Sequence, residues 1–118
     1  MTRARMRRVD EAVRAVLSDA ITQDLKDPRV GFVTVTAVDT SPDLRHARVF
    51  VSVQGGERER AESLEGLRSA HGYLQKRVAG ELRLKYTPTL EFAYDETTER
   101  GMRINELLDD RNRAGGGA

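Results

Sequence analysis

The sequence contains no cysteine among its 118 residues. This absence excludes disulfide bonds, thiol catalysis and cysteine-ligated zinc. The sequence also lacks an apolar run long enough to cross a membrane. Its arginine-rich start is not followed by an apolar segment with a cleavage site, which a secretory signal would need. We therefore expect a cytoplasmic protein without a membrane partner.

Signatures of the common enzyme classes are missing as well. The chain has neither a Gly-x-Ser-x-Gly elbow nor a phosphate loop of the Gly-x-x-x-x-Gly-Lys type. Acidic residues are abundant, but no pair belongs to a recognisable catalytic arrangement. His46 and His71 lie far apart and have no cysteine beside them, so they lack metal-ligand spacing. We expect no enzymatic activity, no metal and no cofactor.

Charge is plentiful and unevenly distributed, although the formal net charge is only +1. Residues 1–8 carry four arginines and no acid, a local charge of +4. Residues 68–86 carry five basic residues against Glu81 alone, again +4, whereas residues 91–110 carry a local charge of −5. Two basic blocks and an acidic end suit a protein with one face for nucleic acid. The alternative is chance scatter in a chain that is 33% charged.

Periodic patterns predict a helix and a hairpin in the first half of the chain. Apolar residues recur at helical spacing from Val9 to Ile21, which predicts a helix over 7–25 that ends before Pro28. β-Branched residues predict a strand over 32–38, with Val33, Val35 and Ala37 on one face. Segment 44–53 alternates cleanly, and residues 39–43 have turn composition, so the two strands form an antiparallel hairpin.

Segment 64–94 organises the second half. Helical spacing of leucine and valine from Leu64 to Leu82 is interrupted by Ser69-Ala70-His71-Gly72. Glycine inside a helix costs roughly 1 kcal/mol relative to alanine, so we predict two short helices that meet at a kink. Pro88 stops helical structure, and the alternation of residues 90–94 predicts a strand.

The predicted order is α-β-β-α-α-β, an α+β domain with helices on one face of a three-stranded sheet. Residues 1–108 would form this single domain, with residues 1–7 as a flexible basic arm. Ile104, Leu107 and Leu108 suggest a last short helix, and residues 109–118 should be a disordered tail.

Several short segments, in this order and spacing, resemble the ribosome-binding factor A family of bacterial small-subunit assembly factors. The segments are Asp27-Pro28-Arg29, Val33-Thr34-Val35-Thr36, Ser41-Pro42-Asp43-Leu44, Ala47-Arg48-Val49, Ser69-Ala70-His71-Gly72, Pro88-x-Leu90-x-Phe92 and Asp95-Glu96-Thr97.

The resemblance implies a type II KH-like domain in which a helix kink at Ala70-His71-Gly72 replaces the usual Gly-x-x-Gly loop. No Gly-x-x-Gly occurs in this sequence. The resemblance also implies binding to the precursor small (30S) subunit and its 16S rRNA, and help with 5′-end processing of that RNA, notably in the cold. Because ordinary KH domains clamp RNA through the missing loop, basic side chains become the better candidates for RNA contact.

The candidate RNA-binding residues form three basic groups and one kink. They are Arg3, Arg5, Arg7 and Arg8 in the arm; Arg45 and Arg48 on a strand; Lys76, Arg77, Arg83 and Lys85; and Ser69, Ala70 and Gly72 at the kink. At the kink, unpaired N–H groups of the following helix would attract phosphate. The competing interpretations are solvated charges and small residues that only permit tight helix packing.

Other conspicuous residues have structural interpretations. Arg29 should pair with a carboxylate or a helix end, and His71 should be exposed or packed. Phe50, Phe92 and Tyr94 fit the core or the sheet surface better than a base-stacking platform.

The function that we predict is a monomeric, non-enzymatic assembly factor that binds the precursor small subunit, with other assembly factors as possible partners. A protein-interaction module that docks through its helices or acidic end is one alternative. A KH-like binder of other single-stranded RNAs is the second.

Overall fold

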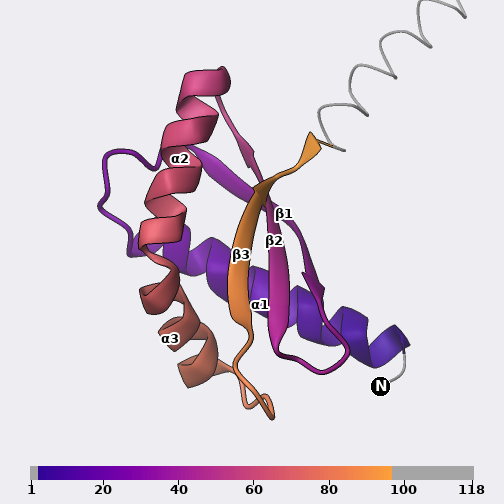
Figure 1. The fold of residues 1–118 in the computed structure, drawn as a ribbon. Helices are drawn as coiled ribbons and strands as arrows, with labels where there is room; N and C mark the ends of the chain where they lie inside the picture. Colours follow the sequence, from indigo (N-terminus) through magenta and orange to yellow (C-terminus); the bar gives the residue numbers. More distant parts are fainter. Residues whose placement is uncertain (1–2, 97–118) are drawn as a thin grey trace, which may run out of the picture.

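The structure is a computed structural model that describes residues 3–96. Its elements are α1 (Arg3–Gln23), β1 (Val33–Thr40), β2 (His46–Val53), α2 (Glu57–Ser69), α3 (His71–Glu81) and β3 (Thr89–Tyr94) (Figure 1). The predicted order and the KH-like α+β class are confirmed. The predicted last helix near Ile104 and the predicted tail at 109–118 lie outside the described residues.

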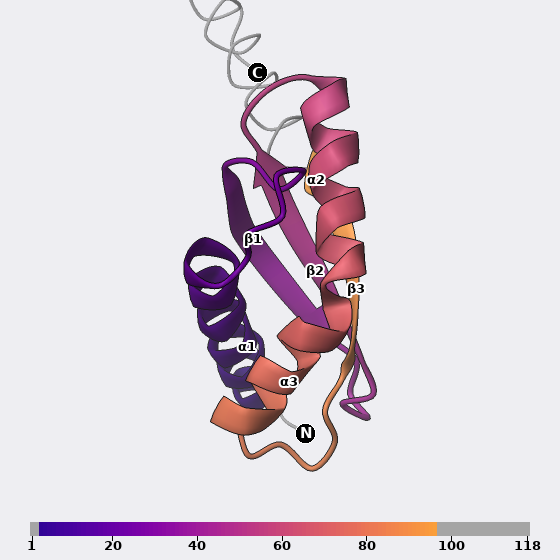
Figure 2. The ribbon, with the colours of Figure 1, turned by 90° about the vertical axis from the view of Figure 1, so that its left-hand side faces the viewer.

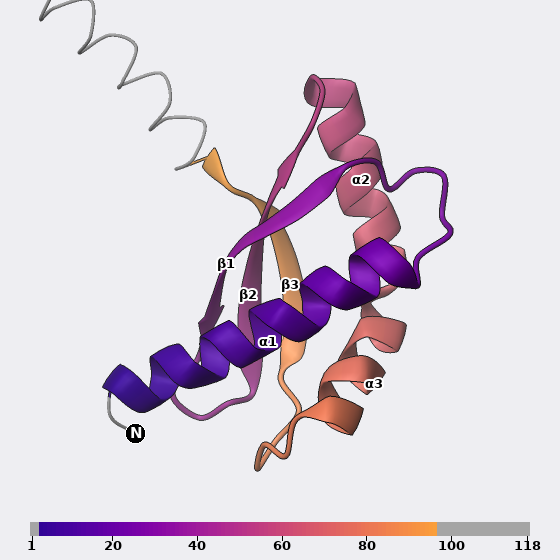
Figure 3. The same cartoon turned by 180° about the vertical axis from the view of Figure 1, so that it is seen from behind.

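The three strands form one sheet in the order β1-β2-β3. β1 and β2 pair antiparallel, as the hairpin prediction requires, whereas β2 and β3 pair in parallel. The three helices lie on the same side of the sheet, with α1 beside α3 (Figure 2). Seen from behind, α1 crosses the strands obliquely (Figure 3). The opposite face of the sheet carries no described helix.

The core lies between that sheet and the helices. Val13 and Leu17 of α1, Leu67 of α2 and Leu74 of α3 are fully buried. They pack against the inward-facing side chains of the strands, which are Val35, Val38, Ala47, Val49, Val51, Val53, Leu90 and Phe92. The alternation predicted for segment 44–53 is therefore confirmed in β2, and burial of these groups supplies the main stabilisation.

The predicted alternation of β1 is wrong in its second half. A β-bulge shifts the register between Val35 and Ala37, so Val35 and Val38 are buried while Ala37 is exposed. One extra residue in a bulged strand reverses which side chains face the core from there on. β-Branched composition does not reveal such an insertion.

The N-terminal helix begins earlier than predicted. α1 starts at Arg3, so residues 3–7 are helical and do not form the flexible arm that we expected. Arginine, alanine and methionine are strong helix formers, and no helix breaker separates them from the periodic segment. Arg5, Arg7 and Arg8 consequently project from a helix, and all three are exposed.

The predicted kink is confirmed at Ala70, which alone separates α2 from α3. Its backbone has φ −92° and ψ 4°, and its N–H donates to the carbonyls of Gly66 and Leu67, each at 3.1 Å. Its own carbonyl accepts from the Leu74 N–H at 3.0 Å, which starts α3. The chain therefore changes direction within a single residue while its neighbouring peptide groups remain hydrogen-bonded.

Candidate nucleic-acid interface

One end of the molecule collects most of the predicted basic residues. The start of α1, the β1–β2 turn and the α3–β3 loop lie at the same end, below the sheet in Figure 1. We name this region the basic end and define it by Arg5, Arg7, Arg8, Arg45, Arg83 and Lys85, all of which are exposed. The two basic blocks, remote in sequence, thus become neighbours through the fold.

The start of α1 adds the field of the helix to these charges. The first turn of α1 contains no acidic residue. Because a helix N-terminus carries partial positive charge, arginines there do not favour helix stability but do increase attraction for anions. Asp10 on the same helix accepts a hydrogen bond from the Thr40 N–H at 2.9 Å, which fixes α1 against the end of β1.

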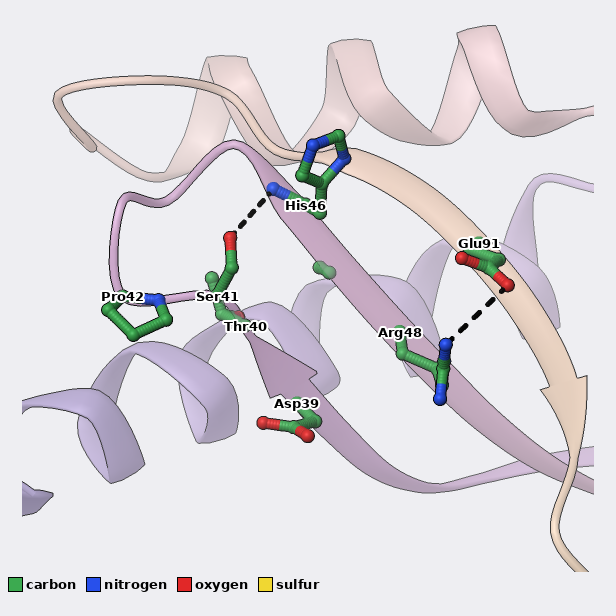
Figure 4. Close-up of a pocket in the computed structure, with 8 residues that line it drawn as sticks. Asp39, Thr40, Ser41, Pro42, His46, Arg48 and Glu91 are labelled. Atoms are coloured by element: carbon green, nitrogen blue, oxygen red, sulfur yellow. Dashed lines mark hydrogen bonds and ion pairs between the residues drawn. The ribbon is translucent and has the colours of Figure 1, made fainter.

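Arg48 occupies the open face of the sheet. It lies 4.0 Å from Glu91 of β3, and 58% of its side chain remains exposed (Figure 4). An exposed pair at this distance contributes little to stability. Beside it, a hollow of about 330 Å³ is bordered by the β1–β2 turn and by His46, which is exposed at the start of β2.

Arg77 does not belong to this surface. Its guanidinium forms ion pairs with Asp19 at 3.0 Å, with Glu81 at 3.1 Å and with Asp24, and its side chain is only 23% exposed. The bonds to these partners, Asp19 first, raise the pKa of Arg77 well above its usual value. The charge of this candidate is therefore used to hold α3 against the C-terminal end of α1.

Tyr73 completes the same cluster. Its hydroxyl donates to Asp24, and this bond, together with the nearby charge of Arg77, lowers the pKa of that carboxyl. Lys76, the neighbour of Arg77 in the sequence, is exposed and remains a candidate for RNA contact.

Arg29 is structural, as predicted. It contacts Asp27 at 2.6 Å and Glu65 of α2 at 3.3 Å, and it donates to the Ser69 hydroxyl at 3.2 Å. Its hydrogen bonds lower the pKa of Asp27. The loop after α1 is thereby attached to the end of α2, where Gly66 lets it come close: a Cβ there would lie 2.6 Å from Val30.

The kink has a hollow of its own. Arg68 and His71 border a space of about 390 Å³ together with Leu90 and Phe92 of β3. His71 is exposed and its Nδ1 lies 2.8 Å from the Arg68 carbonyl. A Cβ at Gly72 would meet no heavy atom within 4 Å, so packing does not require glycine there. The Ser69 hydroxyl accepts a hydrogen bond from Arg29, and the N–H and carbonyl of Ala70 are both bonded within the kink.

No pattern in the sequence pointed to the part played by Tyr86. This residue lies in the α3–β3 loop, and the guanidinium carbon of Arg45 sits over its ring, 4.4 Å from the centroid. The ammonium of Lys85 lies 5.6 Å from the same centroid. In the sequence, Tyr86 is marked only as an aromatic residue next to the basic Lys85 in a non-helical segment, and this pattern alone does not predict a binding site.

Metal-binding clusters and membrane-spanning helices are both absent from the part of the chain that the structure describes. Within 3–96, no group of three or more histidine, aspartate or glutamate side chains is placed to hold a metal ion. No helix in that range is long and apolar enough to span a bilayer. The three-stranded sheet, the kinked helix pair and the exposed cations together define a small KH-like domain with a basic surface.

The comparisons with known proteins identify the family. The family model "Ribosome-binding factor A" matches residues 5–108. A protein of that name from Halothermothrix orenii is 51% identical over 108 residues, which cover 92% of this chain and 88% of the relative. One from Anaeromyxobacter sp. strain Fw109-5 is 48% identical over 110 residues, covering 92% and 90%. The chain belongs to the ribosome-binding factor A family.

Solved structures of relatives share the fold. The crystal structure of ribosome-binding factor A from Thermus thermophilus superposes with a TM-score of 0.68 at 29% identity, covering 75% of this chain and 94% of that one. A Thermus thermophilus homology model fitted into a cryo-EM map of a complex with the 30S subunit has a TM-score of 0.60 at 31% identity. That match covers 71% of this chain and 88% of the other.

Proposed function

We propose that this protein is a non-enzymatic assembly factor that binds the precursor small ribosomal subunit through its 16S rRNA. The observation that carries the proposal is the basic end, where exposed cations come from three separate segments that lie at one end of the fold (Figure 1). The family, and a relative's model that was fitted into a map of a 30S complex, support the small subunit as the partner. We further propose that the protein acts as a cytoplasmic monomer, assists 5′-end processing and is needed most in the cold.

The residues that we propose for RNA contact are a revised form of the predicted set. Arg77 is left out because three carboxylates occupy its guanidinium. The proposed set comprises Arg5, Arg7, Arg8, Arg45, Arg48, Lys76, Arg83 and Lys85, with Arg3 at the start of the same helix.

In this proposal the protein acts by occupancy. Binding favours one arrangement of the precursor RNA over another, and it can shift that equilibrium only by its difference in affinity for the two arrangements. Contacts to phosphates release counterions, so affinity should fall steeply as salt rises. Release then requires an event that weakens the preferred arrangement, such as completion of the RNA structure.

Gradient sedimentation of a lysate at low and at high salt tests the proposal. We expect the protein to travel with free small subunits at low salt, to be absent from translating ribosomes, and to leave the particles at high salt. A protein that stays at the top of the gradient at low salt would contradict the proposal. Binding that persists after nuclease removes accessible RNA would favour a protein partner.

A further inference from the structure

The turn before β2 holds Arg45 in a fixed position. Leu44 adopts φ 63°, an uncommon backbone conformation for a branched side chain, while that side chain is buried to 4% exposure. The Leu44 N–H donates to the Ser41 carbonyl at 2.8 Å, and the Arg45 N–H donates to Asp43 Oδ1 at 3.1 Å. A left-handed residue that is anchored in the core leaves the next residue little freedom.

A second chain segment is fastened to the same place. The Thr89 N–H donates to the Arg45 carbonyl at 2.8 Å, and His46 pairs with Thr89 in the parallel β2–β3 register. The β1–β2 turn and the end of the α3–β3 loop are therefore joined through the backbone. This junction brings Tyr86 under Arg45.

The guanidinium of Arg45 forms an exposed, charged plane over the Tyr86 ring. Its carbon lies 4.4 Å from the ring centroid, and 58% of the Arg45 side chain is accessible. Asp43 lies 4.0 Å away from it, but that carboxylate already accepts hydrogen bonds from the Ser41 hydroxyl and the Arg45 N–H. An aromatic ring orients a guanidinium without neutralising it, so both the plane and the charge remain available.

A hollow of about 410 Å³ lies beside this pair, bordered by Arg45, His46, Tyr86, Thr87 and Thr89. Its volume is within the range of roughly 300–1,000 Å³ seen for small-ligand sites. Its lining combines planar groups with hydroxyl and imidazole side chains. Such a lining can hold a flat ring and form hydrogen bonds with its edge.

We propose that this hollow binds one unpaired RNA nucleotide, whose base stacks on the Arg45–Tyr86 pair while Lys85 neutralises a neighbouring phosphate. The inference rests on the proposed function and specifies how part of the basic end would work. Unpaired bases stack on aromatic rings and on arginine planes, and the nearby ammonium group attracts the backbone. An acidic peptide would match the charge but would leave the planar surface unused.

The test measures the affinity of purified precursor small subunits for five variants over a series of salt concentrations. One of the variants, Lys85→Gln, removes the nearby ammonium group. Arg45→Lys keeps the charge but removes the plane, and Tyr86→Leu removes the ring. Tyr86→Phe keeps the ring, and Arg58→Lys is a matched change of an exposed arginine near the start of α2, away from the basic end. Thermal melting of each variant verifies the fold.

We expect Arg45→Lys and Tyr86→Leu to weaken binding at least about fivefold, the lower end of the effect of losing one stacked base. Tyr86→Phe should recover the binding that Tyr86→Leu loses, and Arg58→Lys should bind like the unmodified protein. Because Tyr86→Leu removes no charge, the slope of log affinity against log salt should stay the same. Lys85→Gln, in contrast, should reduce that slope by about 1.

Two outcomes overturn the inference and are distinguishable from failure of the proposed function. If Arg45→Lys and Tyr86→Leu bind as tightly as the unmodified protein, the stacked nucleotide is refuted while subunit binding stands. If the stacking variants lose affinity equally for particles whose accessible RNA has been digested, the hollow contacts a protein instead. If the unmodified protein itself fails to bind small subunits, the proposed function falls and the inference falls with it.

Discussion

The α1–α3 contact and the basic end each contain an arginine from the predicted RNA-binding set, and the two arginines have opposite surroundings. Arg77 is held by carboxylates from α1, from the residue after α1 and from its own helix. Arg45 lies over a tyrosine ring and stays more than half exposed. Ion pairs with carboxylates neutralise a positive charge within the fold, whereas an aromatic ring leaves that charge available to a ligand. An arginine in the sequence can have either a structural role or a binding role, and the side chains that contact it in the fold distinguish the two.

The largest effect should come from reversing charge at the basic end. The double substitution Arg45→Glu with Lys85→Glu replaces attraction for phosphate by repulsion. We expect affinity for precursor small subunits to fall roughly a hundredfold or more at low salt, with little change in thermal stability because both side chains are exposed. Equilibrium binding and thermal melting measure the two quantities.

Arg58→Glu, which reverses one charge outside the basic end, is the control for that variant, and the two losses are compared per reversed charge. Arg58 is 86% exposed and lies near the start of α2, away from the basic end. Reversal there should leave subunit binding nearly unchanged. Equal losses per reversed charge would show that only the total charge matters, which would contradict the difference between the two regions.

Removing the other arginine should affect folding instead of binding. Arg77→Met keeps helix propensity and an apolar stem but leaves Asp19 and Asp24 without their cation. We expect the melting temperature to fall by several degrees, while affinity per folded molecule stays unchanged. Lys76→Met, next to it on α3 and exposed, controls for the loss of a positive charge. If Arg77→Met melts at the same temperature as the unmodified protein but binds small subunits more weakly, Arg77 belongs to the RNA-binding set after all.

The Arg77 cluster should also make the unfolding free energy depend on pH in acid. The pKa of Asp24 is lowered in the folded state by Tyr73 and Arg77, so the unfolded chain binds more protons there. Its contribution is full above the unfolded pKa of about 3.9 and is lost as pH falls through the lower folded value. We expect the gap in unfolding free energy between the unmodified protein and Asp24→Asn to be constant from neutral pH to about pH 5 and to shrink below about pH 4.

Urea unfolding at a series of pH values measures this gap. Repeating the comparison in the Arg77→Met background should give a smaller gap, because the two residues interact directly. A gap that stays constant down to the most acidic conditions would contradict the role of the carboxylate charge.

The smallest effects should come from glycines in α3. Gly72 and Gly80 both have open space where a Cβ would lie, so alanine at either position should stabilise the fold by about 0.5–1 kcal/mol. If Gly72→Ala and Gly80→Ala bind small subunits equally well, the kink makes no close contact with RNA. Weaker binding by Gly72→Ala alone would add the kink to the interface.

The helices, the hairpin and the kink could be predicted because each depends on a local pattern. Apolar spacing set the helical segments, and the break at Ala70 followed from small residues inside one of them. The bulge in β1 could not be predicted, because it inserts a residue without changing composition. The start of α1 was placed too late because the prediction relied on apolar periodicity, which residues 3–7 lack.

The candidate site was predictable only as a list of charges. Arg45, Arg77 and Lys85 look alike in the sequence, and their separation depends on partners that the fold brings from elsewhere. Asp24 reaches Arg77 from the end of α1, and Tyr86 reaches Arg45 from the α3–β3 loop. Local patterns do not encode such pairings, whereas Arg29 was predictable because Asp27 is two residues away.

The parallel pairing of β3 with β2 has a consequence for synthesis of the chain. Arg45 emerges from the ribosome early, but the loop that carries Tyr86 and the strand that fastens it follow only after α2 and α3. Contacts between segments so distant in sequence form late in folding. A nascent or truncated chain that lacks β3 can expose arginines but cannot assemble the hollow beside them. Only a completed molecule would therefore present the full surface to another ribosome.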